Sequence, residues 1–315
     1  MSKIITITFN PALDKSITAQ ELIPERKLKC SSPVYEPGGG GINVSRAIKK
    51  LGGESVAAYL AGGFAGQEIT RLLTEERIKT IVTDIHNPTR ENLVVTDLEN
   101  HKQYLFDLPG PKVEEHEWKA LLQAIEFAAP ADFIVVSGSF PPGVSLDVFR
   151  DLALMAEQKN ARLIVDTSGD ALMAALKAGV YLIKPNLREI GLLAGKKEID
   201  TTSAIDFAKE LIKGGKCEVI VLSMGGLGAV LINSEMTLHI QPPDVEIKST
   251  VGAGDSLLAG IVLSLGNKKS LKEAVKYGVA CGTAATMNSG TELCTREQAD
   301  HLYHIIDNIA AVHQD

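Results

Sequence analysis

The chain has 315 residues, which is enough for one large α/β domain or two smaller ones with a sizeable buried core. Hydrophobic residues make up 45% and charged residues 23%, values typical of a soluble globular enzyme and not of a disordered chain. The net charge of -7, without a dense Lys/Arg cluster, argues against a nucleic-acid partner. Scattered cysteines argue against a zinc site or a disulfide framework, and no apolar run reaches membrane-spanning length. We therefore expect a cytoplasmic protein without a membrane partner.

The first residues predict a strand of a parallel sheet. Residues 3–9 alternate and are rich in β-branched side chains, and the strand ends at the turn signal Asn10-Pro11. Asp14 follows this end of the strand, where open α/β sheets bind ligands, so it could hold a substrate hydroxyl. A solvated turn aspartate would show the same pattern. Residues 15–36 have short extended pieces and predict a small β element beside the main sheet.

Four consecutive glycines at 38–41 precede an amphipathic helix. One turn does not need four glycines, so the two explanations are a close approach of the backbone to a ligand and a flexible hinge. The segment lacks G-x-G-x-x-G, which weakens a nicotinamide dehydrogenase. Asn43 is a poor interior helix former just after the loop, and its amide could hydrogen-bond a substrate hydroxyl.

The middle of the chain interrupts an otherwise regular alternation of strands and helices. Alternating segments joined by polar turns predict an antiparallel sheet, and they lie at 79–85, 91–98 and 102–108. With 15–36, the segment 79–108 would form a small lid, and the main α/β domain would comprise 1–14, 37–78 and 109–315. Arg90 in the lid suits bidentate contact with a phosphate, although an exposed strand arginine is the commoner case.

The second half places polar or glycine-rich segments after several predicted strands. Ser139 follows the strand at 133–136, on the ligand side of a parallel sheet. Asn186 and Glu189 lie one helical turn apart in K-P-N-L-R-E, and their oxygens could orient Mg²⁺ through water; a capping box has the same pattern. The glycine-rich turn at 223–230 suits either nucleotide phosphates or a plain hairpin.

The segment at 249–262 reads S-T-V-G-A-G-D-S-L-L-A-G-I-V and predicts a glycine-rich loop that enters a buried helix. Unpaired N–H groups and the helix dipole favour an anion at such a helix start. Asp255 stands at this point. An aspartate here is either the N-cap of an ordinary core helix or a group that acts on a ligand.

Three motifs together resemble the signatures of the ribokinase-like carbohydrate kinases: G-G-G-G-I-N-V-S-R, K-P-N-L-R-E and S-T-V-G-A-G-D-S. The similarity extends from N-P-A-L-D at Asn10 to the last predicted helix, and E-P-G-G-G-G-I-N, T-R-x-N and S-G-S-x-P-P-G-V are most similar to the phosphofructokinase-B branch. The resemblance implies a doubly wound, mostly parallel sheet flanked by helices, with a small β-sheet lid that forms a homodimer. It also implies a sugar-phosphate kinase that transfers a phosphoryl group from Mg-ATP to an alcohol.

The same resemblance implies roles for individual residues. Asp255 would be the catalytic base, and the backbone N–H groups of Gly252, Ala253 and Gly254 would stabilise the transferred phosphoryl group. The residues expected to bind the sugar phosphate are Asp14, Lys27, Gly39, Asn43, Arg90 and Ser139. Those expected to bind ATP are Lys184, Asn186, Ser223, Gly225, Gly226 and Gly228. Glu189 would hold Mg²⁺ through water, and the candidate ligands of a K⁺ ion are Ser249, Val251, Ala285, Asn288 and Gly290.

The expected acceptor is fructose 6-phosphate. The 1-phosphofructokinase and tagatose-6-phosphate kinase branches tend to carry a lysine within the glycine loop, where this chain has Gly40. Tagatose 6-phosphate and fructose 1-phosphate remain alternative acceptors. Near the candidate K⁺ ligands, Glu292 stands where the phosphofructokinase-B branch is expected to have an arginine. A non-catalytic sugar-phosphate sensor is an alternative of another class, but it would not need Asp255. A P-loop kinase is excluded because G-x-x-x-x-G-K-[ST] is absent.

Overall fold

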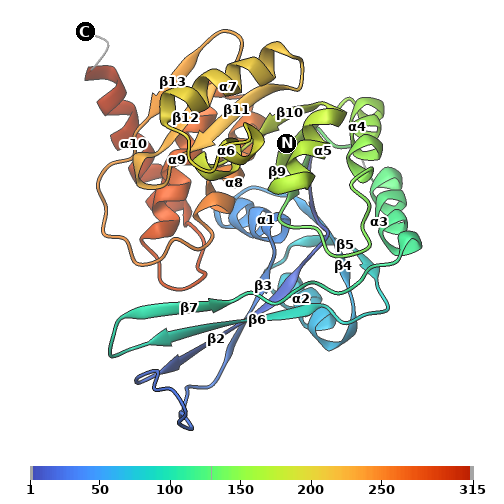
Figure 1. Ribbon diagram of the computed structural model, residues 1–315, viewed down its shortest axis with the longest axis vertical. Coiled ribbons are helices and arrows are strands. Elements are labelled where there is room, and N and C mark those ends of the chain that lie inside the picture. Colours follow the sequence, from blue (N-terminus) through green and yellow to red (C-terminus); the bar gives the residue numbers. More distant parts are fainter. Residues whose placement is uncertain (1–2, 129, 313–315) are drawn as a thin grey trace.

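The computed structural model describes residues 3–128 and 130–312. A nine-stranded sheet carries helices on both faces, and a separate four-stranded sheet projects from one end of it (Figure 1). The expected α/β architecture with a small second sheet is confirmed. Across this described part of the chain, no helix combines the length and the apolar character needed to cross a bilayer.

The large sheet has the order β13-β12-β11-β10-β9-β8-β1-β4-β5. Its strands are β1 (Ile4–Thr8), β4 (Val56–Ala61), β5 (Lys79–Asp84), β8 (Phe133–Ser137), β9 (Arg162–Asp166), β10 (Val180–Ile183), β11 (Cys217–Ser223), β12 (Ala229–Ile232) and β13 (Thr237–Ile240). All neighbours from β11 to β5 pair in parallel, and β12 and β13 add an antiparallel edge. Helices cover both faces, so the central strands β1 and β8 are buried throughout, the two threonines of β1 included.

Each face of the sheet has its own hydrophobic core. One face packs against α3 (Glu115–Phe127), α4 (Val148–Lys159), α5 (Gly169–Ala178), α6 (Leu187–Leu193) and α7 (Thr201–Lys213). The other face packs against α1 (Gly40–Lys50), α8 (Ala253–Gly266), α9 (Leu271–Thr286) and α10 (Arg296–Val312). The remaining helix, α2 (Gly63–Glu75), packs with Leu13 and Tyr59 in a smaller cluster beside the second sheet.

The strand order reverses between β1 and β8. From β1 the chain builds outward through β4 and β5, and from β8 it builds in the other direction through β9, β10 and β11. Ligands of open α/β sheets bind at such a switch point, outside the carboxyl ends of the strands. These ends carry the segments that follow Thr8 and Ser137, which include the predicted ligand residue Ser139.

The small sheet, which we call the lid, has the order β3-β2-β6-β7. It contains β2 (Ala12–Ala19), β3 (Val34–Gly38), β6 (Arg90–Asp97) and β7 (Lys102–Phe106). The predicted lid segment 79–108 is wrong at its start, because β5 pairs with β4 in the large sheet. The predicted boundary at residue 14 is also displaced, because β2 already begins at Ala12. Strand β5 alternates like the lid strands, so its local pattern could not reveal which sheet it joins.

Candidate active site

Asp255 lies in the first turn of α8 and does not cap this helix. The N-cap is Gly252, whose φ of 74° lies in the left-handed region, and a Cβ at this position would stand 2.7 Å from Leu293 Cδ2. The alternative that Asp255 is an N-cap is therefore wrong. Its carboxylate Oδ2 instead accepts a hydrogen bond from Asn43 Nδ2 at 2.9 Å, which joins the start of α8 to α1.

The surroundings of Asp255 disfavour its charged form. Burial raises the pKa of Asp255 to about 7, and the negative charges of Asp166 and Asp14 act in the same direction, while Asn43 and Lys184 oppose it. A carboxyl with a pKa near 7 is close to the optimum for a general base at neutral pH. A perturbed carboxyl in the first turn of a helix is thus a group prepared for proton transfer.

Asp14 lies on β2, where the lid meets the large sheet. Burial raises its pKa to about 6, and the charge of Glu36 adds to this, against a hydrogen bond from Asn92 Nδ2 to Asp14 Oδ1 at 2.9 Å. The backbone of Gly38 approaches so closely that a Cβ there would stand 2.2 Å from Asp14 Oδ2. Sequence reasoning assigned no role to Asn92, although it belongs to the quoted T-R-x-N motif.

A second group of polar side chains lies at the switch point. Asn10 Nδ2 donates to Ser139 Oγ at 2.9 Å, and Arg90 Nη2 donates to the carbonyl of Asn10 at 3.2 Å. The carboxyl ends of β1 and β8 are thereby linked to the first residue of β6. The structure brings the predicted residues Ser139 and Arg90 together through Asn10, which sequence reasoning treated only as a turn signal.

The tetraglycine segment is packed tightly against the two central strands. A Cβ at Gly39, which has a φ of 109°, would stand 2.7 Å from Thr8 Cγ2, and one at Gly40 would stand 2.4 Å from Ser137 Oγ. The N–H of Ile42 donates to Thr8 Oγ1 at 2.8 Å. These contacts exclude a flexible hinge, because the segment is held on both sides. The glycines serve at least to let the start of α1 approach the strand ends.

Lys184 connects the carboxyl end of β10 with the start of α8. Its Nζ lies 3.2 Å from Asp166 Oδ1, and a Cβ at Gly254 would stand 3.3 Å from the same Nζ. Burial alone would lower the pKa of Lys184, but the charge of Asp166 raises it, so the ammonium stays charged. Asp166 ends β9, and sequence reasoning assigned it no role.

Asn186 and Glu189 form the capping box that was the alternative to a magnesium site. Asn186 Oδ1 accepts from the N–H of Glu189, and Glu189 Oε2 accepts from the N–H of Asn186, each at 2.9 Å. Burial raises the pKa of Glu189, and the charge of Asp166 contributes to the same shift. The neighbouring negative charges of Glu189 and Asp166 form a region where a cation would be stabilised.

A cavity of about 420 Å³ lies beside the start of α8, and none of the sugar-binding candidates lines it. It is lined by four of the predicted nucleotide residues, namely Ser223, Gly225, Gly226 and Gly228. Ala253 and Gly254 of the α8 start also line it, together with the apolar side chains of Val245, Leu257 and Val279. Sequence reasoning missed this apolar part, which comes from segments far apart in the chain. Lys184 and Asn186 lie beside the cavity, since Asn186 forms a β-bridge with Ser223.

A larger hollow of about 700 Å³ lies at the opposite edge of the sheet. Its lining includes Arg162, Val180 and Cys217, the residues that start β9, β10 and β11. Amino ends of parallel strands are not the ligand-binding edge of such folds. None of the predicted site residues lies in its lining.

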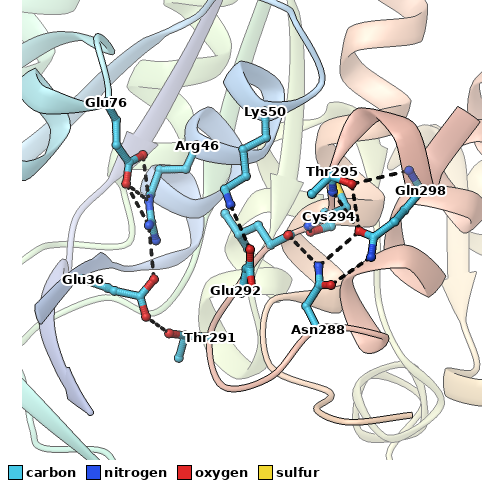
Figure 2. Close-up of polar contacts among 12 residues, drawn as sticks. Glu36, Arg46, Lys50, Glu76, Asn288, Thr291, Glu292, Cys294, Thr295 and Gln298 are labelled. Carbon is cyan, nitrogen blue, oxygen red and sulfur yellow. Dashed lines mark hydrogen bonds and ion pairs between the residues drawn. The ribbon is translucent and has the colours of Figure 1, made fainter. Parts of the chain in front are cut away.

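The loop after α9 holds the glycine-rich segment at 249–254 in place. Ser249 Oγ donates to the carbonyl of Gly290 at 2.6 Å and accepts from the N–H of Val251 at 3.2 Å. Asn288 exchanges hydrogen bonds with Gln298 and donates to the carbonyl of Leu293, as Figure 2 shows. The candidate potassium ligands Ser249, Val251, Asn288 and Gly290 therefore belong to one connected loop pair.

The same loop is tied to the lid by a chain of charged groups. Thr291 Oγ1 donates to Glu36 Oε2 on β3, and Glu36 Oε1 pairs with Arg46 Nη2 at 3.4 Å (Figure 2). Arg46 is almost fully buried and also pairs with Glu76 at 2.8 Å. Glu292, at the position where an arginine was expected, pairs with Lys50 Nζ at 3.7 Å. Breaking one partner of a buried ion pair typically costs about 3–5 kcal/mol, so Arg46 is a structural anchor between lid and domain.

Lys27 is the one predicted sugar-phosphate residue that the structure does not place with the others. It is exposed in the segment that joins β2 to β3, which forms the tip of the lid farthest from the large sheet (Figure 1). Asp14, Asn43, Arg90 and Ser139 lie instead at the junction of lid and sheet.

The fold and this junction define a class of protein. A carboxyl with a pKa near 7 stands at a glycine-rich helix start, between a group of polar side chains and an apolar cavity with a glycine-rich wall, on a doubly wound sheet. This is the arrangement of a phosphotransferase that brings a nucleotide to a polar acceptor.

Comparison with known proteins agrees with this class. The model of the pfkB family carbohydrate kinases matches residues 6–298, and the chain belongs to this family. It is 40% identical to the ATP-dependent 6-phosphofructokinase isozyme 2 of Escherichia coli (strain K12), over 96% of this chain and 98% of that protein. It is 31% identical to the 1-phosphofructokinase of Bacillus subtilis (strain 168), over 95% and 97% of the two chains. The crystal structure of phosphofructokinase-2 from Escherichia coli in complex with potassium matches with a TM-score of 0.93 at 40% identity, covering 98% of this chain and all of that chain.

Proposed function

We propose that this chain is an ATP-dependent 6-phosphofructokinase, which converts fructose 6-phosphate and ATP into fructose 1,6-bisphosphate and ADP. The observation that carries the proposal is the position of Asp255 between two ligand regions. Its carboxylate is bonded to Asn43, and the adjoining Ala253 and Gly254 line the 420 Å³ cavity. One helical turn would therefore contact both the acceptor and the donor of a phosphoryl group.

Asp255 would receive the proton of the acceptor hydroxyl. Its Oδ2 is engaged by Asn43, so Oδ1 is the oxygen left to take the proton. The loose transition state of phosphoryl transfer needs alignment and charge neutralisation more than a strong base. Backbone N–H groups of Gly252, Ala253 and Gly254 would act on the transferred group, as predicted from the sequence. Lys184 Nζ adds a positive charge beside Gly254.

Magnesium fits the carboxylates on the other side of Lys184. Mg²⁺ prefers oxygen ligands and several retained waters, and Glu189 and Asp166 supply neighbouring carboxylate oxygens. Bound there, the ion would neutralise charge on the nucleotide phosphates. We further propose that K⁺ binds the loop pair of Ser249 and Gly290, on the support of the potassium complex of the related Escherichia coli enzyme.

Fructose 6-phosphate is the acceptor that the residues around the glycine loop favour. Gly40 has no room for a side chain, because its Cβ would stand 2.4 Å from Ser137 Oγ. A cation therefore cannot enter from this position without a shift of the strand end. Arg90 supplies a cation at the lid instead, and its guanidinium reaches the carbonyl of Asn10 at the switch point. The alternative acceptors are tagatose 6-phosphate and fructose 1-phosphate.

We also propose that two lids pack together in a homodimer. Both edge strands of the lid expose apolar side chains, with Leu105 at 54% and Phe106 at 50% exposure on β7 and Val34 at 60% on β3. Exposed apolar groups that gather on one small sheet mark an interaction surface.

A cytoplasmic location fits the four cysteines, which are all free.

Turnover with purified protein tests the function. The chain is assayed with ATP and fructose 6-phosphate, tagatose 6-phosphate or fructose 1-phosphate, and we expect the largest kcat/KM with fructose 6-phosphate. A larger value with fructose 1-phosphate would overturn the acceptor. Asp255→Asn should remove turnover and leave ATP binding by calorimetry intact. Binding of both ligands by the unaltered chain without any turnover would instead indicate a sugar-phosphate sensor.

A further inference from the structure

Arg90 is held in position by backbone groups from two segments. Its Nη2 donates to the carbonyl of Asn10 at 3.2 Å, and its Nη1 donates to the carbonyl of Leu108 at 2.9 Å. The side chain is only 10% exposed, and these contacts fix the plane of the guanidinium at the lid junction. The orientation of Arg90 therefore does not depend on a carboxylate partner.

A carboxylate nevertheless forms an ion pair with this guanidinium. Asp107 Oδ1 lies 2.5 Å from Arg90 Nη1, while the Asp107 side chain is 75% exposed. Asp107 belongs to the exposed segment between β7 and α3 and can turn into water at little cost. Buried Arg90 Nε has no hydrogen-bond partner among the described residues. The guanidinium is thus paired with an anion that is easily displaced, and it keeps one donor unused.

We propose that Asp107 sets the affinity of the site for a sugar phosphate by competing with the phosphate for Arg90. This inference rests on the proposed function, in which Arg90 binds the phosphate of the acceptor. An incoming phosphate either replaces the Asp107 carboxylate or shares the guanidinium with it, and in both cases it meets a negative charge. Loss of that charge should strengthen binding of phosphorylated ligands and leave an uncharged sugar unaffected.

The size of the effect follows from the exposure of Asp107. Exposed ion pairs contribute up to about 1 kcal/mol, which corresponds to a change in affinity of up to about fivefold. Added salt screens such a contribution, so the difference should shrink between low and high ionic strength.

The test compares Asp107→Asn with a matched control. Glu91→Gln removes the same charge from the residue that follows Arg90 on β6. The Glu91 side chain is exposed and points to the opposite face of the strand from Arg90. Dissociation constants are measured by calorimetry for fructose 6-phosphate, inorganic phosphate and fructose, without nucleotide. We expect Asp107→Asn to bind both phosphate ligands about two- to fivefold more tightly. Glu91→Gln should match the unaltered chain, and the KM for the sugar phosphate should fall with Asp107→Asn.

A double-mutant cycle completes the test. On an Arg90→Gln background, Asp107→Asn should have no effect on phosphate binding, because the shared guanidinium is gone. Unchanged or weaker binding by Asp107→Asn overturns the proposal and assigns Asp107 to positioning Arg90. An equal gain with Glu91→Gln also overturns it, since the effect would then be one of net charge. If the unaltered chain fails to phosphorylate fructose 6-phosphate, the proposed function is wrong, but binding of inorganic phosphate still tests the competition between Asp107 and phosphate. If neither the unaltered chain nor Asp107→Asn binds fructose 6-phosphate or inorganic phosphate, the proposed function and the competition are both overturned.

Discussion

Replacing Asp255 by Asn should stabilise the protein while it removes catalysis. The folded chain raises the pKa of Asp255 from 3.8 to about 7, first through burial and then through the charge of Asp166. Between these two values the folded state binds a proton that the unfolded state has lost. Stability therefore falls as pH rises from about 4 to 7, because the folded state disfavours the charged carboxylate. An asparagine keeps the shape and can still accept from Asn43, but it carries no charge.

The gain in the free energy of unfolding follows from the shift in the pKa of Asp255. A change from 3.8 to about 7 corresponds to about 4 kcal/mol at pH 8, at 1.36 kcal/mol for each pKa unit. With an unfolding entropy near 2.1 cal/mol/K per residue over 315 residues, this raises Tm by roughly 6 °C. At pH 4 the carboxyl is largely protonated in the folded state and half protonated in the unfolded state. The difference between the two proteins should then shrink to below about 1 kcal/mol.

Thermal unfolding of both proteins at several pH values between 4 and 8 provides the assay. The control is Asp200→Asn, because Asp200 caps α7 by accepting from the N–H of Ser203, and hydrogen bonds from Ser203 lower its pKa. This control should destabilise the protein at pH 8, the opposite sign to Asp255→Asn. A Tm difference for Asp255→Asn that does not change with pH, or a lower Tm at pH 8, would refute the reasoning.

Three further substitutions probe other parts of the site. Asp166→Asn should lower the pKa of Asp255, so the acid limb of the kcat/KM profile should move to lower pH by about one unit, within the usual range of charge effects. Thr291→Val removes the hydrogen bond to Glu36 and should cost about 1 kcal/mol of stability and raise the KM for the sugar phosphate several-fold. Gly40→Ala places a Cβ against the end of β8 and should reduce kcat/KM by about 100-fold or more, since misplacement near 1 Å has such effects.

Each of these substitutions has a control with the same chemical change. Asp170→Asn removes an exposed aspartate from the first turn of α5, and its pH profile should match that of the unaltered chain. Thr291→Ser keeps the hydroxyl and should restore most of the lost affinity. Gly214→Ala tests glycine replacement at the end of α7, where the nearest atom would stand 3.3 Å away, and should keep full activity. Equal effects of a substitution and its control would contradict the corresponding argument.

Most of the large sheet could be predicted from the sequence because its buried strands are short apolar runs, and β4, β8, β9 and β10 are each followed by a helix. The strands of the lid were harder to predict from the sequence. Strand β5 has the same alternation as β6 and β7, yet it pairs in parallel with β4 at Val56↔Lys79. Sheet membership depends on pairing partners that are distant in the chain, and strand patterns do not encode them. The helix start at Gly252 was found from its glycines, but the exact cap needed the contact with Leu293.

A site residue could be predicted where its chemical type and local motif indicate a role. It could not be predicted where its role depends on residues that only the fold brings into contact. Asp255 and Asn43 stood out because a carboxylate and an amide follow glycine loops, and Arg90 stood out because an arginine suits bidentate contact with a phosphate. Asp166 and Asn92 were invisible, since their importance comes from groups that touch them: Lys184 in one case and Asp14 in the other. The apolar half of the 420 Å³ cavity likewise comes from segments that only the fold brings together.

The raised pKa values of Asp14 and Asp255 indicate how binding of the acceptor would ionise the catalytic base. Asp14 and Asp255 carry pKa values of about 6 and about 7 in the absence of ligand, so near neutral pH a large share of Asp255 is protonated. Sugar hydroxyls that donate to these carboxylates favour the charged form and lower both pKa values. Binding of the acceptor would then ionise Asp255 at the moment when a base is needed. Without the acceptor the base is less ionised, which disfavours transfer of the phosphoryl group to water.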